Sequence, residues 1–293
     1  MLILQNILEN LKSQFAKSRN AQQRSIWFVY TIIAIIIPFT SSKTSNLLRC
    51  LRTLFGFNDI GKKRFYTFMA SPKLPWVDLW HSLWKMIPEP TTDGRLLLAL
   101  DDCINPKTGK EIFGCDRVFD HAAKQNQSKY PWAQNIVAVG LLKIVKSRWA
   151  CLPLSYRFYH LKKSIEKVNQ VIRGHRIDFQ TKFEQAVEMI SEISNVFDQN
   201  RIIAITDSWF GNDGLWNPLS TLLGSRFHMI SRLRANNNVF DLPEPRAKTG
   251  PGRPRKYGRK LGNTSWLAYS LKPFAEQYSV NLYGRNRSVH ACE

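Results

Sequence analysis

A run of five apolar residues that ends in two acids constrains this chain more than any other feature. Residues 96–100 lack a period-two alternation, which predicts a short strand buried on both faces, and Asp101 and Asp102 follow it directly. The same arrangement returns at residues 202–206, which Asp207 follows. Ligands of α/β sheets bind beyond the carboxyl ends of the strands, so we expect these acids to meet at one sheet edge. Carboxylate oxygens suit Mg²⁺, and the pair of strands therefore favours a divalent-cation site.

Two interpretations of these acids stay open at this point. In the first, Asp101 or Asp102 joins Asp207 in holding two Mg²⁺ ions. One ion would activate a water or a sugar hydroxyl, and the other would stabilise the leaving oxygen of a phosphodiester. In the second, the aspartates are turn residues or helix caps at strand ends, where they are common.

The charge of the chain points to a polyanionic partner. Its 293 residues hold 42 Lys and Arg against 22 Asp and Glu, a net charge of +20. The excess runs through the whole sequence: 12 basic against 5 acidic residues over 1–94, 19 against 13 over 95–233, and 11 against 4 over 234–293. Nucleic acid ranks ahead of a membrane surface as the partner, and the alternative is a merely basic soluble protein. A hydrophobic content of 44% excludes wholesale disorder.

The cysteines favour a reducing compartment. There are five of them, with no C-x-x-C pair and no preceding signal peptide, so we expect a cytoplasmic protein. Zinc ligation by Cys103, Cys115 and His121 is an alternative, but their spacing matches no standard site and buried, unreactive thiols fit better.

Residues 1–90 predict a helical N-terminal domain that contacts DNA. Amphipathic spacing predicts a helix over 2–19 and another opening near 41–45, and Trp76, Trp80 and Trp84 repeat every four residues along a packed helix face. Residues 26–39 are apolar but number about fourteen, whereas a membrane-spanning helix needs about twenty. We therefore expect a buried core helix there and no membrane association.

A basic stretch in this domain is the first candidate DNA contact. Lys62, Lys63 and Arg64 interleave with aromatic residues up to residue 68, as a phosphate-contacting surface does. A solvated basic helix face explains the pattern equally well.

Residues 91–233 predict a mixed α/β domain. Strands are expected at 111–115, 136–144, 148–158 and 227–231, besides the two acid-ended ones. The clearest helix spans 178–199 with Asp178 as its N-cap, and a second lies near 215–223. Strands that alternate with helices in this order predict a mixed sheet flanked by helices.

Residues 234–293 form a basic segment with a β-rich character. Its sequence Gly-Arg-Pro-Arg-Lys at 252–256 resembles an AT-hook, in which Arg253 and Arg255, with Lys256, would enter a narrow A·T minor groove. The alternative is a solvated basic loop.

The motifs around both acids carry a family resemblance. The segments LLLALDDCINPKTGKEIFG, HAAKQNQSKYPWAQNIVAVGLLKI, RWACLPLSYRFY and IIAITDSWFGN together resemble bacterial insertion-sequence transposases of the DDE superfamily. The likeness covers about residues 25–272. It implies an RNase H-like catalytic core, two Mg²⁺ or Mn²⁺ ions, and cleavage and strand transfer at inverted-repeat DNA ends.

The resemblance also assigns residues. The first catalytic, metal-binding acid of the family falls on Asp101, with Asp102 as a supporting residue and the alternative ligand, and the second falls on Asp207. Family members bring two double-stranded DNA ends together, which implies at least a homodimer on DNA and association with the nucleoid.

The third acid of the family is not found. Its signature places a Tyr, an Arg, the Glu and a Lys on one helix, and Glu276, which has Tyr269 before it, lacks the Arg and the Lys in register. We therefore expect the chain to stop within an insertion that precedes this acid. Two functions follow: a transposase whose Glu comes from a frameshifted extension or a second polypeptide, or a catalytically inactive DNA-binding fragment that inhibits the full-length enzyme.

Overall fold

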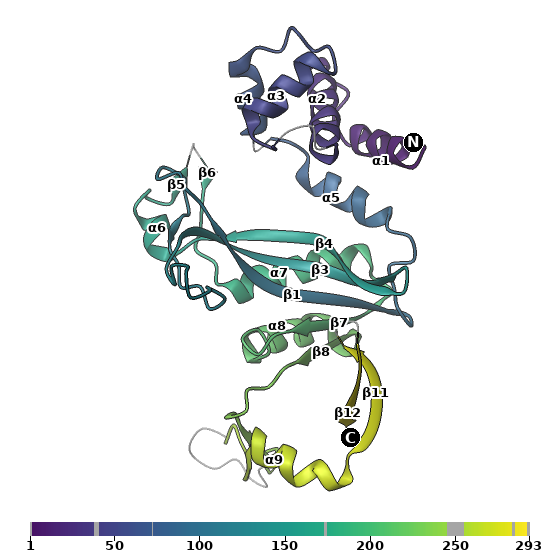
Figure 1. Cartoon of the computed structure of the whole chain (residues 1–293), viewed down its shortest axis with the longest axis vertical. Coiled ribbons are helices and arrows are strands. Elements are labelled where there is room, and N and C mark those ends of the chain that lie inside the picture. The colour runs from purple at the N-terminus through teal and green to yellow at the C-terminus, as the bar shows by residue number, and fades with distance from the viewer. Residues whose placement is uncertain are drawn as a thin grey trace.

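The fold has a helical region, a central mixed sheet and a C-terminal appendage (Figure 1). The computed structural model describes residues 2–37, 41–71, 73–172, 175–244, 255–282 and 285–291. The helical region and the sheet each bury an apolar cluster of their own. The appendage follows the sheet at the opposite end of the molecule from the helical region.

Five helices build the N-terminal region: α1 (Leu2–Ser13), α2 (Arg19–Ile36), α3 (Thr44–Thr53), α4 (Lys62–Met69) and α5 (Trp76–Lys85). The helix predicted over 2–19 is α1, which ends earlier than expected, because the chain turns after Ser13 and Ser18 caps the next helix by accepting the N–H of Ala21. The core helix expected at 26–39 coincides with the second half of α2, which buries Trp27, Val29 and Ala34, and residues 38 and 39 lie outside the described residues. Among the described residues, no helix has the length and apolar character needed to cross a bilayer.

The central sheet has six strands: β1 (Arg95–Pro106), β2 (Asp116–Arg117), β3 (Trp132–Val145), β4 (Arg148–Tyr159), β7 (Arg201–Thr206) and β8 (Phe227–Ser231). Their order is β2-β3-β1-β7-β8, and β4 also pairs with β3. The β1–β3 and β3–β4 pairs are antiparallel, whereas β1, β7 and β8 run parallel. The predicted mixed sheet flanked by helices is confirmed.

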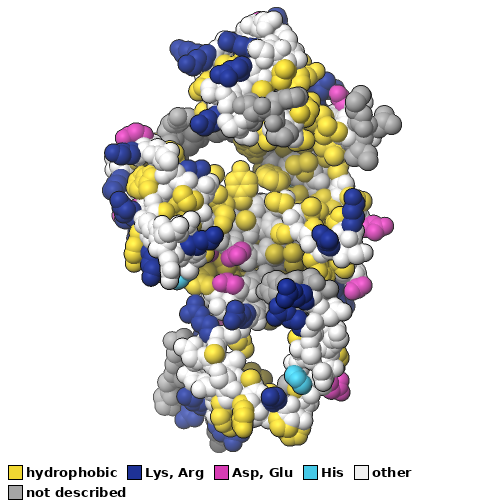
Figure 2. Space-filling view, in the orientation of Figure 1, with side chains coloured by type: hydrophobic (Ala, Val, Ile, Leu, Met, Phe, Trp, Pro, Cys, Tyr) yellow, Lys and Arg dark blue, Asp and Glu magenta, His cyan; other side chains and the backbone are white. Residues whose placement is uncertain are grey.

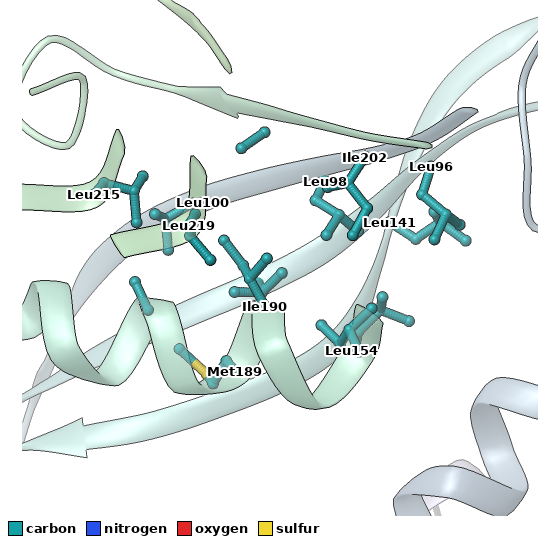
Figure 3. Close-up of a cluster of buried hydrophobic side chains, with 14 of the residues drawn as sticks. Leu96, Leu98, Leu100, Leu141, Leu154, Met189, Ile190, Ile202, Leu215 and Leu219 are labelled. Carbon is teal, nitrogen blue, oxygen red and sulfur yellow. The ribbon is translucent and has the colours of Figure 1, made fainter. Parts of the chain in front are cut away.

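One face of the sheet carries the main hydrophobic core. Leu96, Leu98 and Leu100 of β1 point into it, and the helices α7 (Lys182–Val196) and α8 (Asp213–Leu223) cover it (Figure 3). Residues of one parity face the same way along a strand, so Leu97 and Ala99 lie on the opposite face, where they are only partly buried. The expectation that residues 96–100 are buried on both faces was therefore wrong.

Three further expectations met different outcomes. The strands predicted at 136–144, 148–158, 202–206 and 227–231 are present as β3, β4, β7 and β8. Residues 111–115 are a loop, because Gly109 and Gly114 with their polar neighbours form turns there. The helix predicted over 178–199 is α7, which Thr181 caps in place of Asp178: its hydroxyl accepts the N–H of Glu184, whose carboxylate accepts the N–H of Thr181.

The remaining elements lie outside the main sheet. The small helix α6 (Lys162–Glu166) precedes the pair β5 (Val171–Ile172) and β6 (His175–Arg176). After β8, the appendage contains β9 (Asn238–Phe240), β10 (Lys260–Asn263), α9 (Thr264–Leu271), β11 (Glu276–Leu282) and β12 (Arg285–Ala291), with the short helices η1 (Gly224–Arg226) and η2 (Lys272–Phe274). β9 pairs with β10 and β11 with β12, so neither pair extends the central sheet.

Helix α5 connects the two hydrophobic cores. Leu79 packs into the core of the helical region, whereas Trp84, one turn further along, is 2% exposed and belongs to the core of the sheet. The indole Nε1 of Trp84 donates a hydrogen bond to the carbonyl of Leu154 on β4, at 2.9 Å. Trp76 lies at the start of the same helix and is 46% exposed, so only part of the predicted tryptophan stripe is packed.

We predict that Trp84→Ala lowers the free energy of unfolding by about 3–5 kcal/mol, because it removes a large buried side chain and leaves the Leu154 carbonyl unpaired. Trp76→Ala removes the same atoms from an exposed position and should cost less than about 1 kcal/mol. Urea denaturation of both variants measures the difference, and equal losses would contradict this account of α5.

Candidate active site

Asp101 and Asp207 lie side by side at the level where the parallel pairing of β1 with β7 ends. Asp101 and Asp102 do not follow a short strand as expected, because β1 continues to Pro106 and stays paired with β3. The parallel pairing of β1 with β7 sets Leu97 beside Ile203 and Leu100 beside Thr206, and the next residue on each strand is one of the acids. Neighbouring strands lie about 4.8 Å apart, which brings the two carboxylates within electrostatic reach. Both side chains share the parity of the face that α7 and α8 leave uncovered, and both residues are exposed.

The loop after β7 fixes Asp207. Its Oδ1 accepts the backbone N–H groups of Trp209 at 2.9 Å and Phe210 at 3.1 Å, and its carbonyl accepts the N–H of Gly211 and the hydroxyl of Ser231. A Cβ at position 211 would overlap the Ser231 hydroxyl, so glycine is required where this loop passes β8. Among the described residues, Oδ2 of Asp207 has no hydrogen-bond partner.

Asp101 is held in a similar way. Its Oδ1 accepts the N–H of Asp102 at 2.8 Å, and its Oδ2 has no partner in the part of the chain that the structure describes. Partial burial raises the pKa of Asp101, and the negative charges of Asp207 and Asp102 raise it further, against the lowering effects of its backbone hydrogen bond and of Lys182. A cation between the two acids would relieve this repulsion.

Asp102 points to the other face of β1. Its Oδ2 accepts a hydrogen bond from the Asn135 side chain at 2.9 Å and forms an ion pair with Lys182 at 2.6 Å. The side chains of Lys182 and Asp102 are 17% and 26% exposed. Of these two acids within β1, Asp101 is therefore the one that shares a face with Asp207, whereas Asp102 contacts residues on the core side.

Lys182 links Asp102 to the loop after β7. Its ammonium lies 5.2 Å from the ring centroid of Trp209 and 5.3 Å from that of Tyr159. Trp209 in turn stacks on Phe183, with ring centroids 4.9 Å apart and planes at 10°. The first turn of α7 therefore supports both acid-ended strands at once.

Sequence patterns did not single out Lys182, Asn135 or Trp209 as site residues. A usable signal was present for the first, since Thr181 and Glu184 form a T-x-x-E capping box that fixes where α7 begins. With the helix start fixed, Lys182 becomes its first residue and faces the sheet edge. Nothing in the sequence identifies Asn135 as the partner of Asp102, because that contact depends on the β1–β3 register.

The other predicted residues lie away from this edge. Lys62, Lys63 and Arg64 open α4 in the helical region. Arg253 lies outside the described residues, whereas Arg255 and Lys256 are exposed and Lys256 pairs with Asp213 at 2.7 Å. No described part of the chain groups three His, Cys, Asp or Glu side chains for a metal ion, so Cys103, Cys115 and His121 form no zinc site.

The thiols differ from expectation in their exposure. Cys50 and Cys115 are buried, but Cys103 and Cys151 are exposed, because both lie on the less covered face or edge of the sheet. Partial burial of the sulfur nevertheless raises the pKa of Cys103, and the nearby Asp102 and Asp101 raise it further. A thiol that resists ionisation is a poor nucleophile and metal ligand.

The donor set at the sheet edge fits a hard divalent cation. Asp101 and Asp207 each present one carboxylate oxygen without a hydrogen-bond partner among the described residues, and oxygen ligands are those that Mg²⁺ and Mn²⁺ prefer. Backbone N–H groups occupy the second oxygen of each carboxylate, which restricts its rotation. Asp102 does not belong to this donor set.

Comparison with protein families gave one match. The family described as DDE superfamily endonuclease matches residues 14–280, a stretch that contains both acid-ended strands and most of the helical region. No curated protein and no solved structure matches the chain significantly.

We predict that Asp101→Asn raises the melting temperature at pH 7 in buffer free of divalent cations. Because the pKa of Asp101 is raised in the folded protein, its ionisation destabilises the folded state relative to the unfolded state. The wild type therefore loses stability relative to the variant as the pH rises from 3.8 through the folded-state pKa. Below pH 3.8 the two proteins should melt together. Calorimetry at both pH values tests this, with Asp198→Asn as a control that makes the same chemical change at an exposed position. A variant that melts below the wild type at pH 7 would contradict it.

We also predict energetic coupling between Asp102 and Lys182. Breaking this largely buried pair leaves one charge without its partner, so a double-mutant cycle with Asp102→Asn and Lys182→Met should give a coupling of about 1–3 kcal/mol. The pair Asp116–Lys163 has a similar distance of 2.7 Å, but its lysine is 59% exposed, and its cycle should give less than about 1 kcal/mol. Chemical denaturation provides the energies. Equal coupling in the two cycles would show that burial does not strengthen the first pair.

Proposed function

Because the chain belongs to the DDE superfamily of endonucleases, we propose that it is a transposase that cleaves DNA with Asp101 and Asp207 as its metal-binding acids. The observation that supports this most is the adjacency of the two carboxylates on the less covered face of the sheet, each with one oxygen available. We propose further that the central sheet is an RNase H-like core. Its strand order, with three parallel strands beside an antiparallel hairpin, is compatible with that fold.

In this proposal, Asp101 and Asp207 bind two Mg²⁺ or Mn²⁺ ions. Bound ions supply an activated water or hydroxyl for attack on a phosphodiester and neutralise charge on the leaving oxygen. The protein's own contribution is to hold both carboxylates at one edge, through the N–H groups of Asp102, Trp209 and Phe210. Lys182 supports this edge from the core side by pairing with the Asp102 carboxylate and partly offsetting its negative charge.

The proposed substrate is double-stranded DNA at the inverted-repeat ends of an insertion sequence. The net charge of +20 supports a polyanionic substrate, since neutralised phosphates release their counterions. Cleavage and joining at two ends require both to be present together, so we propose that the chain acts as a homodimer on DNA. Arg253, Arg255 and Lys256 would add contacts in A·T-rich minor grooves.

A second function is DNA binding without cleavage, as an inactive or inhibitory partner of a complete transposase. The observation that favours it is the composition of the site: in the described ranges, no third Asp, Glu, His or Cys joins Asp101 and Asp207 in a group that could hold a metal ion. A metal site with fewer carboxylates than the family uses would bind its ions weakly.

We predict that the purified chain nicks a DNA duplex that carries its inverted-repeat end, and only with Mg²⁺ or Mn²⁺ present. Asp101→Asn and Asp207→Asn should each lower the nicking rate at least about 100-fold, because each removes a charged ligand from the cation site. Gel analysis of an end-labelled duplex measures the rate.

Asp102→Asn is the matched control, because it makes the same chemical change one residue along β1, on the opposite face. Its nicking rate should stay within about tenfold of the wild type. A tenfold loss corresponds to an activation free energy that is higher by about 1.4 kcal/mol, as a slight displacement of the site would cause. Nicking that survives Asp101→Asn or Asp207→Asn would disprove these roles. DNA binding without nicking by the wild type, alone or with a complete homologue, would favour the second function.

A further inference from the structure

A cavity of about 590 Å³ opens between α2 and α4 in the helical region, far from the sheet edge. Three of its lining side chains are basic: Arg24 from α2, and Lys63 and Arg64 from α4. The rest of the lining is uncharged, and no acidic residue takes part. Figure 2 shows Lys and Arg side chains gathered on this end of the molecule.

The floor of the cavity is aromatic and orients Arg64. Trp27 and Phe68 are both 4% exposed and meet edge to face, with ring centroids 5.6 Å apart. The guanidinium of Arg64 lies 5.1 Å from the Trp27 ring centroid and donates a hydrogen bond from Nη2 to the Gln23 side-chain oxygen at 2.6 Å. Arg64 is therefore held in place before any ligand arrives, with further N–H donors still available.

The positive charge of this cavity is not neutralised within the described part of the chain. No ion pair joins Arg24, Lys63 or Arg64 to a carboxylate there. In the sequence, residues 19–69 contain eight Lys and Arg but a single acid, Asp59. Three uncompensated cations around one hollow favour an anionic ligand.

The volume of this cavity and the presence of a second cavity beside it indicate that the anionic ligand is a polymer. Its volume lies in the range of small-molecule sites, about 300–1,000 Å³, and exceeds what a lone phosphate needs. A second cavity of about 260 Å³ shares Arg24 and adds Lys73. Two hollows that share one arginine suit a chain of phosphates joined by sugars.

We propose that this α2–α4 cavity binds a phosphodiester of the DNA backbone, an inference that rests on the proposed function for the choice of DNA. Arg64 meets the phosphate with its fork of N–H donors, and Lys63 and Arg24 add charge from the two walls. The aromatic floor faces the sugar carbons next to the phosphate. The bound duplex then lies against the helical region, while Asp101 and Asp207 remain free for the cleavage site.

The fold separates residues that the sequence grouped together. Lys62 is adjacent to Lys63, but its ammonium lies 6.0 Å from the Tyr66 ring centroid and it does not line the cavity. Arg24 does line it, although it lies 39 positions before Lys63 in the sequence. Replacing Arg24 or Lys62 by an uncharged residue removes one positive charge in either case. The two variants therefore have the same net charge and differ in whether the lost cation lines the cavity.

The first test is fluorescence anisotropy of a labelled duplex with the full chain. Arg24→Gln and Lys63→Gln should each weaken binding by about threefold to tenfold near 0.1 M salt and lower the slope of log affinity against log salt by about 0.9. Lys62→Gln removes the same charge one residue away and should change the affinity by less than about twofold. Circular dichroism checks that all three variants fold.

Protection from acetylation provides a test that needs no variant. Bound duplex should protect Lys63 of the wild-type chain from an amine-acetylating reagent several-fold more than it protects Lys62, as mass spectrometry of the peptides would show. Inorganic phosphate at an equal concentration of phosphate groups should protect Lys63 much less, and equal protection would assign the cavity to a free anion.

The outcomes separate this inference from the proposed function. If the wild type nicks DNA but Lys62→Gln weakens binding as much as Arg24→Gln and Lys63→Gln do, the cavity assignment fails and the nuclease stands. If the cavity variants weaken binding and Lys63 is protected, while nicking is absent or survives Asp101→Asn, the cavity assignment stands. Absent nicking then disproves cleavage by this chain, and surviving nicking disproves the role of Asp101.

Discussion

The parallel pairing of β1 with β7 is the contact on which the candidate site depends. It joins strands about a hundred residues apart in the chain and sets Leu100 beside Thr206, so that the residue after each is an acid: Asp101 within β1, and Asp207 directly after β7. A slip of one residue in this register would turn one acid toward the core, since side chains alternate between faces. The leucines that precede Asp101 prevent this slip, because Leu96, Leu98 and Leu100 must face α7 to be buried.

The same alternation gives the two neighbouring acids different environments. Asp101 faces away from the helices and meets Asp207, whereas Asp102 faces the start of α7 and pairs with Lys182. Two adjacent carboxylates within one strand thus differ in solvation and in partner. In the proposed function Asp101 binds metal, whereas Asp102 ties β1 to α7, which in turn packs against the loop that carries Asp207.

Helix α5 couples this site to the helical region. Its Leu79 and Trp84 belong to different cores, so neither core is complete without the helix that they share. The proposed DNA-binding cavity and the proposed cleavage site thereby belong to two regions that α5 joins through its buried residues Leu79 and Trp84. A duplex bound at one would be held at a defined distance from the other as long as α5 stays packed.

The sequence by itself determined most of the local elements and singled out Asp101, Asp102 and Asp207 as candidate site residues. Periodicity and apolar runs predicted most strands and helices, and the quoted motifs indicated the DDE family, which is confirmed. Capping was misjudged at Asp178 because the T-x-x-E signal three residues later is stronger. Sequence patterns left open which of Asp101 and Asp102 lies beside Asp207, and which basic residues lie together around the α2–α4 cavity. Only the tertiary structure decided these points, because strand parity relative to α7 and the approach of α2 to α4 depend on contacts between residues far apart in the chain.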